Sequence, residues 1–148
     1  MRANQSGITI VELLLAVAIG SLVTGLMGTA IYQSFAVTNR GSDAMTALHD
    51  VQNAGHWLSL DGQQASSATG GATLGLTLPN ASTITYAISG TDLIRTAGTS
   101  KLTVARNITY LDFAVDGRVV TMTINSAPTG GWGVSEQKVY KVYLRPTG

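Results

Sequence analysis

The stretch Gly7-Ile8-Thr9-Ile10-Val11-Glu12-Leu13-Leu14 decides the fold, because it opens a long apolar run that continues to Ala36. No charged residue occurs between Glu12 and Arg40. As a helix, residues 13–36 would extend about 36 Å at a rise of 1.5 Å per residue. That length exceeds the roughly 30 Å thickness of a bilayer hydrocarbon core. The sequence therefore predicts a membrane-spanning helix near the N-terminus.

Glu12 separates this segment from simpler membrane signals. A secretory signal peptide has a shorter apolar region and ends in a small-x-small cleavage site. A plain signal anchor fits the length, but a carboxylate near the start of a membrane helix costs a few kcal/mol and needs a partner or a function. Cleavage between Gly7 and Ile8 would place a new α-amino group four residues before Glu12, on the same helix face. The partner of Glu12 is then the amine of its own subunit or that of a neighbour.

Residues 7–14 resemble the class III signal of type IV pilins and type II secretion pseudopilins. The resemblance implies that residues 1–7 are a leader removed by prepilin peptidase after Gly7, and that Ile8 becomes the N-methylated mature terminus. It also implies that Glu12 pairs with a neighbouring subunit's amine during assembly. Ile8 departs from the phenylalanine that is usual in the family.

The same resemblance implies a location and a set of partners. We expect a single-pass protein of the inner (cytoplasmic) membrane with its head outside the cytoplasm, and later a periplasmic or cell-surface filament. The expected partners are other pilin or pseudopilin subunits, prepilin peptidase, the inner-membrane assembly platform, and membrane lipid before assembly.

Small residues recur at four-residue spacing within the apolar run. Such spacing lets helix backbones approach closely in lipid or in a filament core. Membrane helices are also simply richer in glycine than soluble ones, and the sequence leaves both explanations open. The candidate packing residues are Gly20, Ser21, Thr24, Gly25 and Gly28.

The helix is expected to continue beyond the membrane segment, because no proline occurs before Pro79. Residues 37–65 are more polar, and their apolar positions recur every three or four residues, which predicts an amphipathic helix with one buried face. The residues of that predicted face are Ala44, Leu48, Val51, Ala54 and Leu58. We therefore predict one helix from about Ile8 to about Ala65.

Residues 66–148 change to an alternating pattern typical of strands. After a break at residues 66–73, six strands are predicted at residues 74–78, 83–88, 92–95, 101–113, 118–124 and 138–144. Asp116-Gly117 between two apolar runs gives the firmest hairpin. Short connections indicate an antiparallel sheet, and alternation indicates that one face packs on a helix. The predicted class is α+β, a long helix packed on a C-terminal antiparallel sheet, as in pilins.

The head also resembles W-type minor pilins and J-type minor pseudopilins. The resemblance lies in residues 84–88, 92–96 and 104–113 and in Leu144-Arg145, which end the last predicted strand. It implies a low-copy subunit that initiates or caps a filament.

The sequence offers no catalytic constellation, and we expect no enzyme, no cofactor and no metal. The chain has no cysteine, which excludes disulfides and thiolate sites. His49 and His56 are seven residues apart, whereas helical pairs that chelate one ion are normally spaced by three or four. Asp112 and Asp116 are candidates for calcium, although the turn explains Asp116 without an ion.

The charges are divided along the chain, with five acidic residues against one basic in residues 8–92, and seven basic against three acidic in residues 93–148. This division suits contacts between copies or relatives better than nucleic-acid binding. Trp57 is expected in the helix–sheet core, and Trp132 either as an exposed contact residue or folded over the sheet edge. Two functions remain: a filament subunit, or a single-pass membrane-anchored β-sheet binding module that does not assemble.

Overall fold

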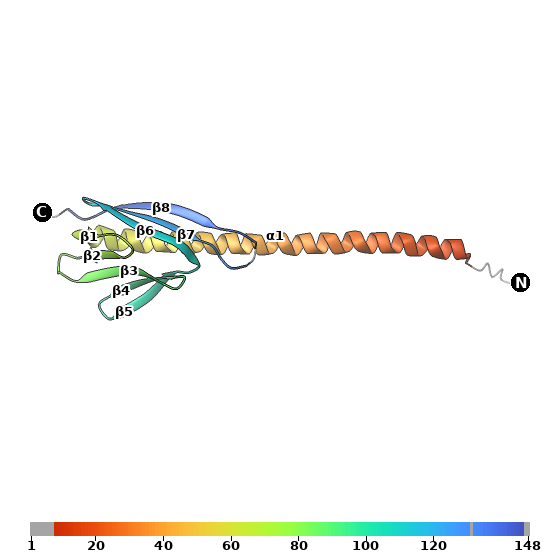
Figure 1. The fold of residues 1–148 in the computed structure, drawn as a ribbon, viewed down its shortest axis with the longest axis horizontal. Coiled ribbons are helices and arrows are strands. Elements are labelled where there is room, and N and C mark those ends of the chain that lie inside the picture. Colours follow the sequence, from red (N-terminus) through yellow and green to blue (C-terminus); the bar gives the residue numbers. More distant parts are fainter. Residues whose placement is uncertain (1–7, 131, 147–148) are drawn as a thin grey trace, which may run out of the picture. The chain divides into compact units, whose positions relative to one another are not determined.

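The computed structural model describes residues 8–130 and 132–146, which form two compact units divided between Asn39 and Arg40. A single helix, α1 (Ile10–Gln64), makes up the first unit and begins the second, and all the strands belong to the second unit (Figure 1). The predicted α+β class is confirmed, and the helix bounds differ from the predicted ones by one or two residues.

The buried face of α1 in the second unit begins at Ala47. Val51, Ala54 and Leu58 are fully buried, as the amphipathic pattern predicts. Ala44 is exposed, so the prediction is wrong at that position. It precedes the first buried residue of the helix, in the part that the strands do not cover.

The strands form two antiparallel sheets instead of the expected single one. The first has the order β1 (Ser67–Thr69), β2 (Leu74–Thr77), β3 (Thr83–Ser89), β4 (Asp92–Ala97), β5 (Ser100–Ala105). The second has the order β6 (Ile108–Asp116), β7 (Val119–Ser126), β8 (Glu136–Tyr143). We refer to them as the five-stranded and the three-stranded sheet.

The predicted strand at residues 101–113 is wrong, because the chain changes sheets within it. Asn107 has φ 54°, a left-handed conformation that ends a strand. Asparagine tolerates this conformation better than most residues. The segment is therefore β5 and β6, which lie in different sheets. β1 lies within the break expected at residues 66–73, where three small or polar residues carry no alternating apolar pattern.

The Asp116-Gly117 hairpin is confirmed. Gly117 has φ 57°, and β6 pairs with β7 from Asp116↔Val119 onward. Gly90 and Gly98, the first residues of the β3–β4 and β4–β5 turns, are left-handed as well.

One hydrophobic core joins α1 to both sheets. It contains Leu58 from the helix, Tyr86 from the five-stranded sheet and Met122 from the three-stranded sheet, all fully buried. β8 approaches α1 closely at Gly62, where an added Cβ would lie 2.6 Å from Cγ1 of Val142. The head is therefore one packed unit, although its strands form two sheets.

Candidate functional site

The predicted cleavage position, Gly7, lies outside the described residues. Ile8 is described, is 77% exposed, and precedes the first helical residue, Ile10. The side chain of Glu12 is also exposed and lies in the first turn of α1. The unpaired amide groups of a helix N-terminus favour a carboxylate at this place.

Thr9 and Glu12 form a capping box at the start of α1. The Glu12 amide donates to Oγ1 of Thr9 at 3.3 Å, and Oε2 of Glu12 accepts from the Thr9 amide and hydroxyl, each at 3.4 Å. This reciprocal arrangement satisfies amide groups that the helix itself leaves unpaired. Sequence reasoning missed Thr9, although the Thr-x-x-Glu spacing before an apolar run is the signal for such a cap.

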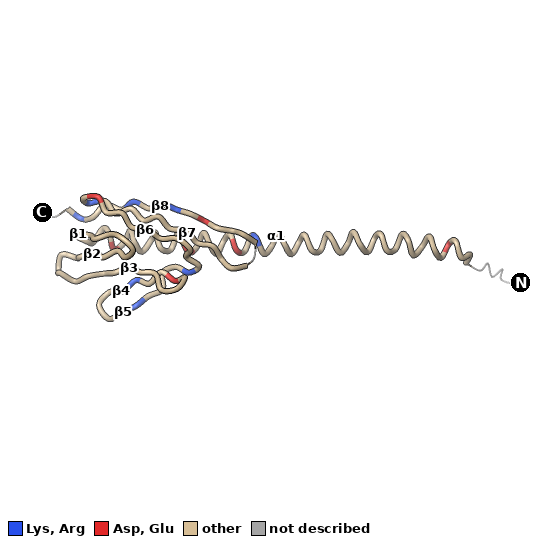
Figure 2. The backbone as a smooth tube through the Cα atoms, in the orientation of Figure 1, with Lys and Arg blue, Asp and Glu red and all other residues tan. Residues whose placement is uncertain are grey.

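The apolar part of α1 meets the length and composition expected of a membrane span, and none of the residues in that window is buried. Figure 2 shows this part of the helix without charge. Each serine and threonine hydroxyl that it carries donates to a backbone carbonyl three or four residues earlier; examples are Ser21 to Ala18 at 2.9 Å and Thr24 to Gly20 at 2.8 Å. These serine and threonine hydroxyls are thus satisfied within the helix, as lipid requires of buried polar groups.

The candidate packing glycines have open surroundings. A Cβ added at Gly20, Gly25 or Gly28 meets no atom within 4 Å in the described part of the chain. The chain's own fold therefore does not require glycine at these places. Ser21 and Thr24 are likewise exposed, so the small-residue positions are available to a neighbouring helix.

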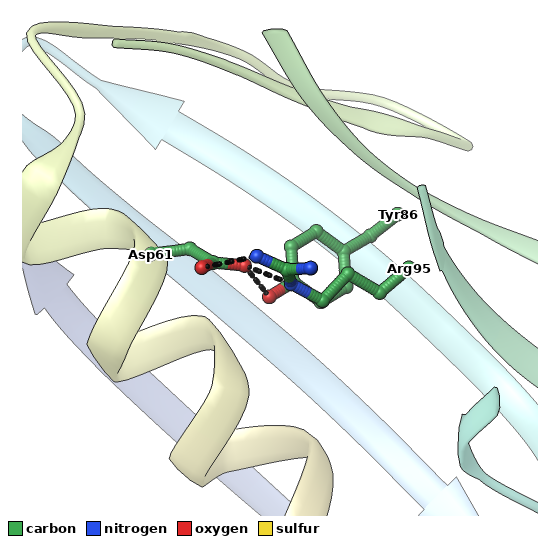
Figure 3. Close-up of polar contacts among 3 residues, drawn as sticks. All are labelled: Asp61, Tyr86 and Arg95. Carbon is green, nitrogen blue, oxygen red and sulfur yellow. Dashed lines mark hydrogen bonds and ion pairs between the residues drawn. The ribbon is translucent and has the colours of Figure 1, made fainter. Parts of the chain in front are cut away.

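In the head, Asp61 is the most strongly bonded buried carboxylate (Figure 3). Arg95 donates Nε to Oδ2 at 2.6 Å and Nη2 to Oδ1 at 2.8 Å, and the Tyr86 hydroxyl donates to Oδ2. Burial and the hydrogen bond to Asp61 raise the pKa of Tyr86 above its ordinary value. Both carboxylate oxygens are occupied within the fold, so the cluster joins α1 to β3 and β4.

Asp50 is a second buried carboxylate on α1, and its bonded partners are neutral groups. It accepts from the Arg106 amide at 3.2 Å, the Asn107 side-chain amide at 3.1 Å and the Ser126 hydroxyl at 3.3 Å. These donors come from the β5–β6 connection and the end of β7. Asp50 therefore holds the place where the chain changes sheets, and it too is a structural residue.

The alternative metal candidates are separate and exposed. His49 and His56 are exposed on α1, and Asp112 and Asp116 are exposed on β6. Within residues 8–130 and 132–146, no three His, Cys, Asp or Glu side chains come together in a way that would hold an ion.

Each tryptophan packs against an arginine. Trp57 is half-buried beside the core, with the Arg95 guanidinium 4.9 Å from its ring centroid. Trp132 is half-buried in the β7–β8 loop, with the Arg40 guanidinium 5.3 Å from its ring centroid. Trp132 is therefore neither fully exposed nor folded over the sheet edge, the two placements that the sequence left open. Its ring lies against α1 instead.

Residues 2–28 match the family described as the prokaryotic N-terminal methylation motif. Comparison with curated proteins gives no match. The match includes Gly7, Ile8, Glu12 and the candidate packing residues, and stops before the head. Together with the apolar run of α1, it indicates a type IV pilin-like or pseudopilin-like protein that is processed at its N-terminus and anchored in the membrane by a single pass.

Proposed function

We propose that this protein is a structural subunit of a type IV pilus or a type II secretion pseudopilus, cut after Gly7 by prepilin peptidase and assembled through its N-terminal helix. Before assembly the subunit sits in the inner membrane with its head outside the cytoplasm. The single observation that carries the proposal is Glu12, an exposed carboxylate at the start of an uncharged membrane helix, within the matched methylation motif.

The hydrogen bonds of Glu12 support a role in pairing. Its contacts with Thr9 are long, at 3.4 Å, whereas a charge-assisted bond between an ammonium group and a carboxylate is about 2.7–2.9 Å and roughly twice as strong as a neutral one. In a low-dielectric surrounding, an α-amino group from a neighbour would therefore displace the weak cap. The open positions at Gly20, Gly25 and Gly28 allow that neighbour's helix to come close.

We further propose that the subunit is a minor one, present in few copies. This rests only on the resemblance of the head segments and of Leu144-Arg145, the pair at the end of the last predicted strand. Quantitative mass spectrometry of sheared filaments should find this chain at well below the amount of the shaft subunit. An amount equal to the shaft subunit would contradict it.

The second candidate function is a membrane-anchored binding module that does not assemble. A hollow of about 420 Å³ on the five-stranded sheet favours it, since such a volume is large enough for a small ligand. The hollow is lined by Ala87, Ile88, Ser89, Ile94, Thr96, Lys101, Leu102 and Thr103.

Glu12→Gln separates the two functions, because it removes the charge while keeping the size of the side chain. In the native host the variant should insert in the membrane at the normal level and be missing from sheared filaments. The matched control is Glu136→Gln, which removes a partly exposed carboxylate paired with Lys138 at 2.9 Å in the head and should assemble normally. Assembly of Glu12→Gln at the normal level would exclude the pairing role.

The mature N-terminus provides an independent test of processing. Mass spectrometry of the membrane-inserted protein should find methylated Ile8 as the first residue. Intact Met1 in cells that make filaments would contradict cleavage after Gly7.

A further inference from the structure

The β7–β8 loop is much longer than the pairing of its strands requires. β7 ends at Ser126 and β8 begins at Glu136, and the two are antiparallel neighbours. Two residues are enough to join such neighbours, and the β3–β4, β4–β5 and β6–β7 connections of this head have that length. Residues 127–135 also contain no charged side chain. Both the length and the lack of charge need another explanation.

The loop lies on α1 at the first residues of the head unit. Gly130 touches the Asp43 side chain so closely that an added Cβ would overlap its carboxylate. The Trp132 ring lies under the guanidinium of Arg40, which is exposed. The extra length thus delivers an aromatic ring to the first basic residue that follows the apolar run.

The sequence keeps this pair close to any membrane that holds residues 13–36. Arg40 follows Ala36 by four residues of the same helix, which is about 6 Å along it. The polar layer on each side of a hydrocarbon core is about 5–8 Å deep. Tryptophan is enriched in that layer, and the arginine side chain combines an apolar stem with a charged end that reaches water.

We propose that the β7–β8 loop is a membrane-contact surface that places Trp132 in the lipid headgroup layer while the subunit waits in the bilayer. The partner is the lipid surface itself. Arg40 holds the ring on one side, and residues 127–135 themselves bring no charged side chain to the lipid. The proposal rests on membrane insertion of α1 and does not depend on filament assembly.

The two tryptophans provide a matched pair for the test. Trp57 also packs against an arginine, but it lies 17 residues after Arg40 on α1, which is about 25 Å further along the helix. Trp57→Phe leaves Trp132 as the single tryptophan, and Trp132→Phe leaves Trp57. The full chain of each variant is inserted into phosphatidylcholine–phosphatidylglycerol vesicles whose acyl chains carry bromine near the headgroup.

Fluorescence quenching by the bromines measures which ring touches lipid. We expect Trp132 to be quenched at least about twofold more than Trp57, because only Trp132 lies in the interfacial layer. Equal quenching of the two rings would overturn the proposal. So would the absence of Trp132 quenching in vesicles from which carbonate does not extract the protein, because the chain is then inserted. A Trp132 signal that is unquenched in vesicles but shifts on filament formation would instead identify a neighbouring subunit as the partner.

The Glu12→Gln background separates this inference from the proposed function. Glu12→Gln is expected to insert without assembling, and the quenching of Trp132 should be unchanged in it. If Glu12→Gln assembles normally while Trp132 is still quenched, the pairing role fails and the membrane contact stands. Loss of the Trp132 quenching in inserted Glu12→Gln would overturn the membrane contact.

Discussion

Two aspartates on α1 are buried in the head, and the fold accounts for both without a ligand. Removing one partner of a buried ion pair typically costs about 3–5 kcal/mol, because the other charge stays buried and uncompensated. In the folded head the charge of Asp61 is compensated by two bonds from Arg95 and one from Tyr86. In the unfolded chain the Tyr86 hydroxyl has a pKa of about 10, whereas burial and the bond to Asp61 raise its pKa in the folded head.

We predict that Tyr86 makes the head less stable above about pH 10. Burial and the bond to Asp61 raise the pKa of Tyr86, so the unfolded chain loses the hydroxyl proton first and the free energy of unfolding falls as pH rises. The slope from one such group is about 1.4 kcal/mol per pH unit. Tyr86→Phe should lose about 1 kcal/mol at neutral pH and have a correspondingly shallower alkaline slope.

Urea unfolding of the detergent-solubilised chain at pH 8 to 11, followed by tryptophan fluorescence, checks this prediction. Tyr143→Phe is the control, because that side chain is 70% exposed and its removal should leave the slope unchanged. An alkaline slope in Tyr86→Phe as steep as that of the unmodified chain would contradict the prediction.

At the residue scale, the sequence predicted Glu12 but neither buried aspartate. Glu12 can be recognised from the sequence alone, because the long run that follows it contains no other charged residue before Arg40. The partners of Asp61 are 25 and 34 residues away, on two different strands. Their meeting depends on strand register, which the alternating pattern alone does not give.

At the element scale, the contact between α1 and β8 depends on two glycines. Gly55 lies under the ring of Tyr140 and Gly62 under Val142, and both are buried. Glycine in a helix costs about 1 kcal/mol relative to alanine. The helix accepts that cost here because any side chain would push β8 away from the core.

We predict that Gly62→Ala destabilises the head although alanine favours the helix. The added Cβ would lie 2.6 Å from Cγ1 of Val142, and overpacking of this kind costs about 1–3 kcal/mol. Gly41→Ala is the matched control, because a Cβ there meets no atom within 4 Å in the described part of the chain. It should be neutral or slightly stabilising. Urea midpoints of both variants decide the matter, and a Gly62→Ala midpoint at or above that of Gly41→Ala would contradict the close approach.

The sequence predicted the helix and most strands, and the errors have local causes. Alternation in the sequence marked β2, β3, β4, β7 and β8. Burial alternates along β2 and β7 and in the first half of β3, whereas β4 and β8 each have one buried residue, Leu93 and Val142. The alternating pattern continues across Arg106 and Asn107, because the two-residue connection between β5 and β6 is too short to interrupt it visibly. The backbone at Asn107 divides one expected strand into β5 and β6 and one expected sheet into two.

At the scale of the whole molecule, the two units are stabilised in different ways. The apolar part of α1 keeps its hydrogen bonds within the helix and buries no side chain in the described chain. The head instead has one core that α1 shares with both sheets. Lipid or detergent therefore stabilises the first unit, while packing stabilises the second.

We predict that urea unfolds the head in one step in detergent and leaves the membrane part of α1 helical. The head should unfold cooperatively because both sheets share one core, as single domains of this size usually do. Residues 10–39 have no contact in that core and keep their backbone bonds in the micelle. Far-ultraviolet circular dichroism should therefore retain roughly half of the helical signal after the tryptophan transition is complete. Trp57 should report the same midpoint as the loss of strand signal. If the whole helical signal disappeared with the tryptophan transition, the two units would be one cooperative structure, and the separation of membrane anchor and head would be wrong.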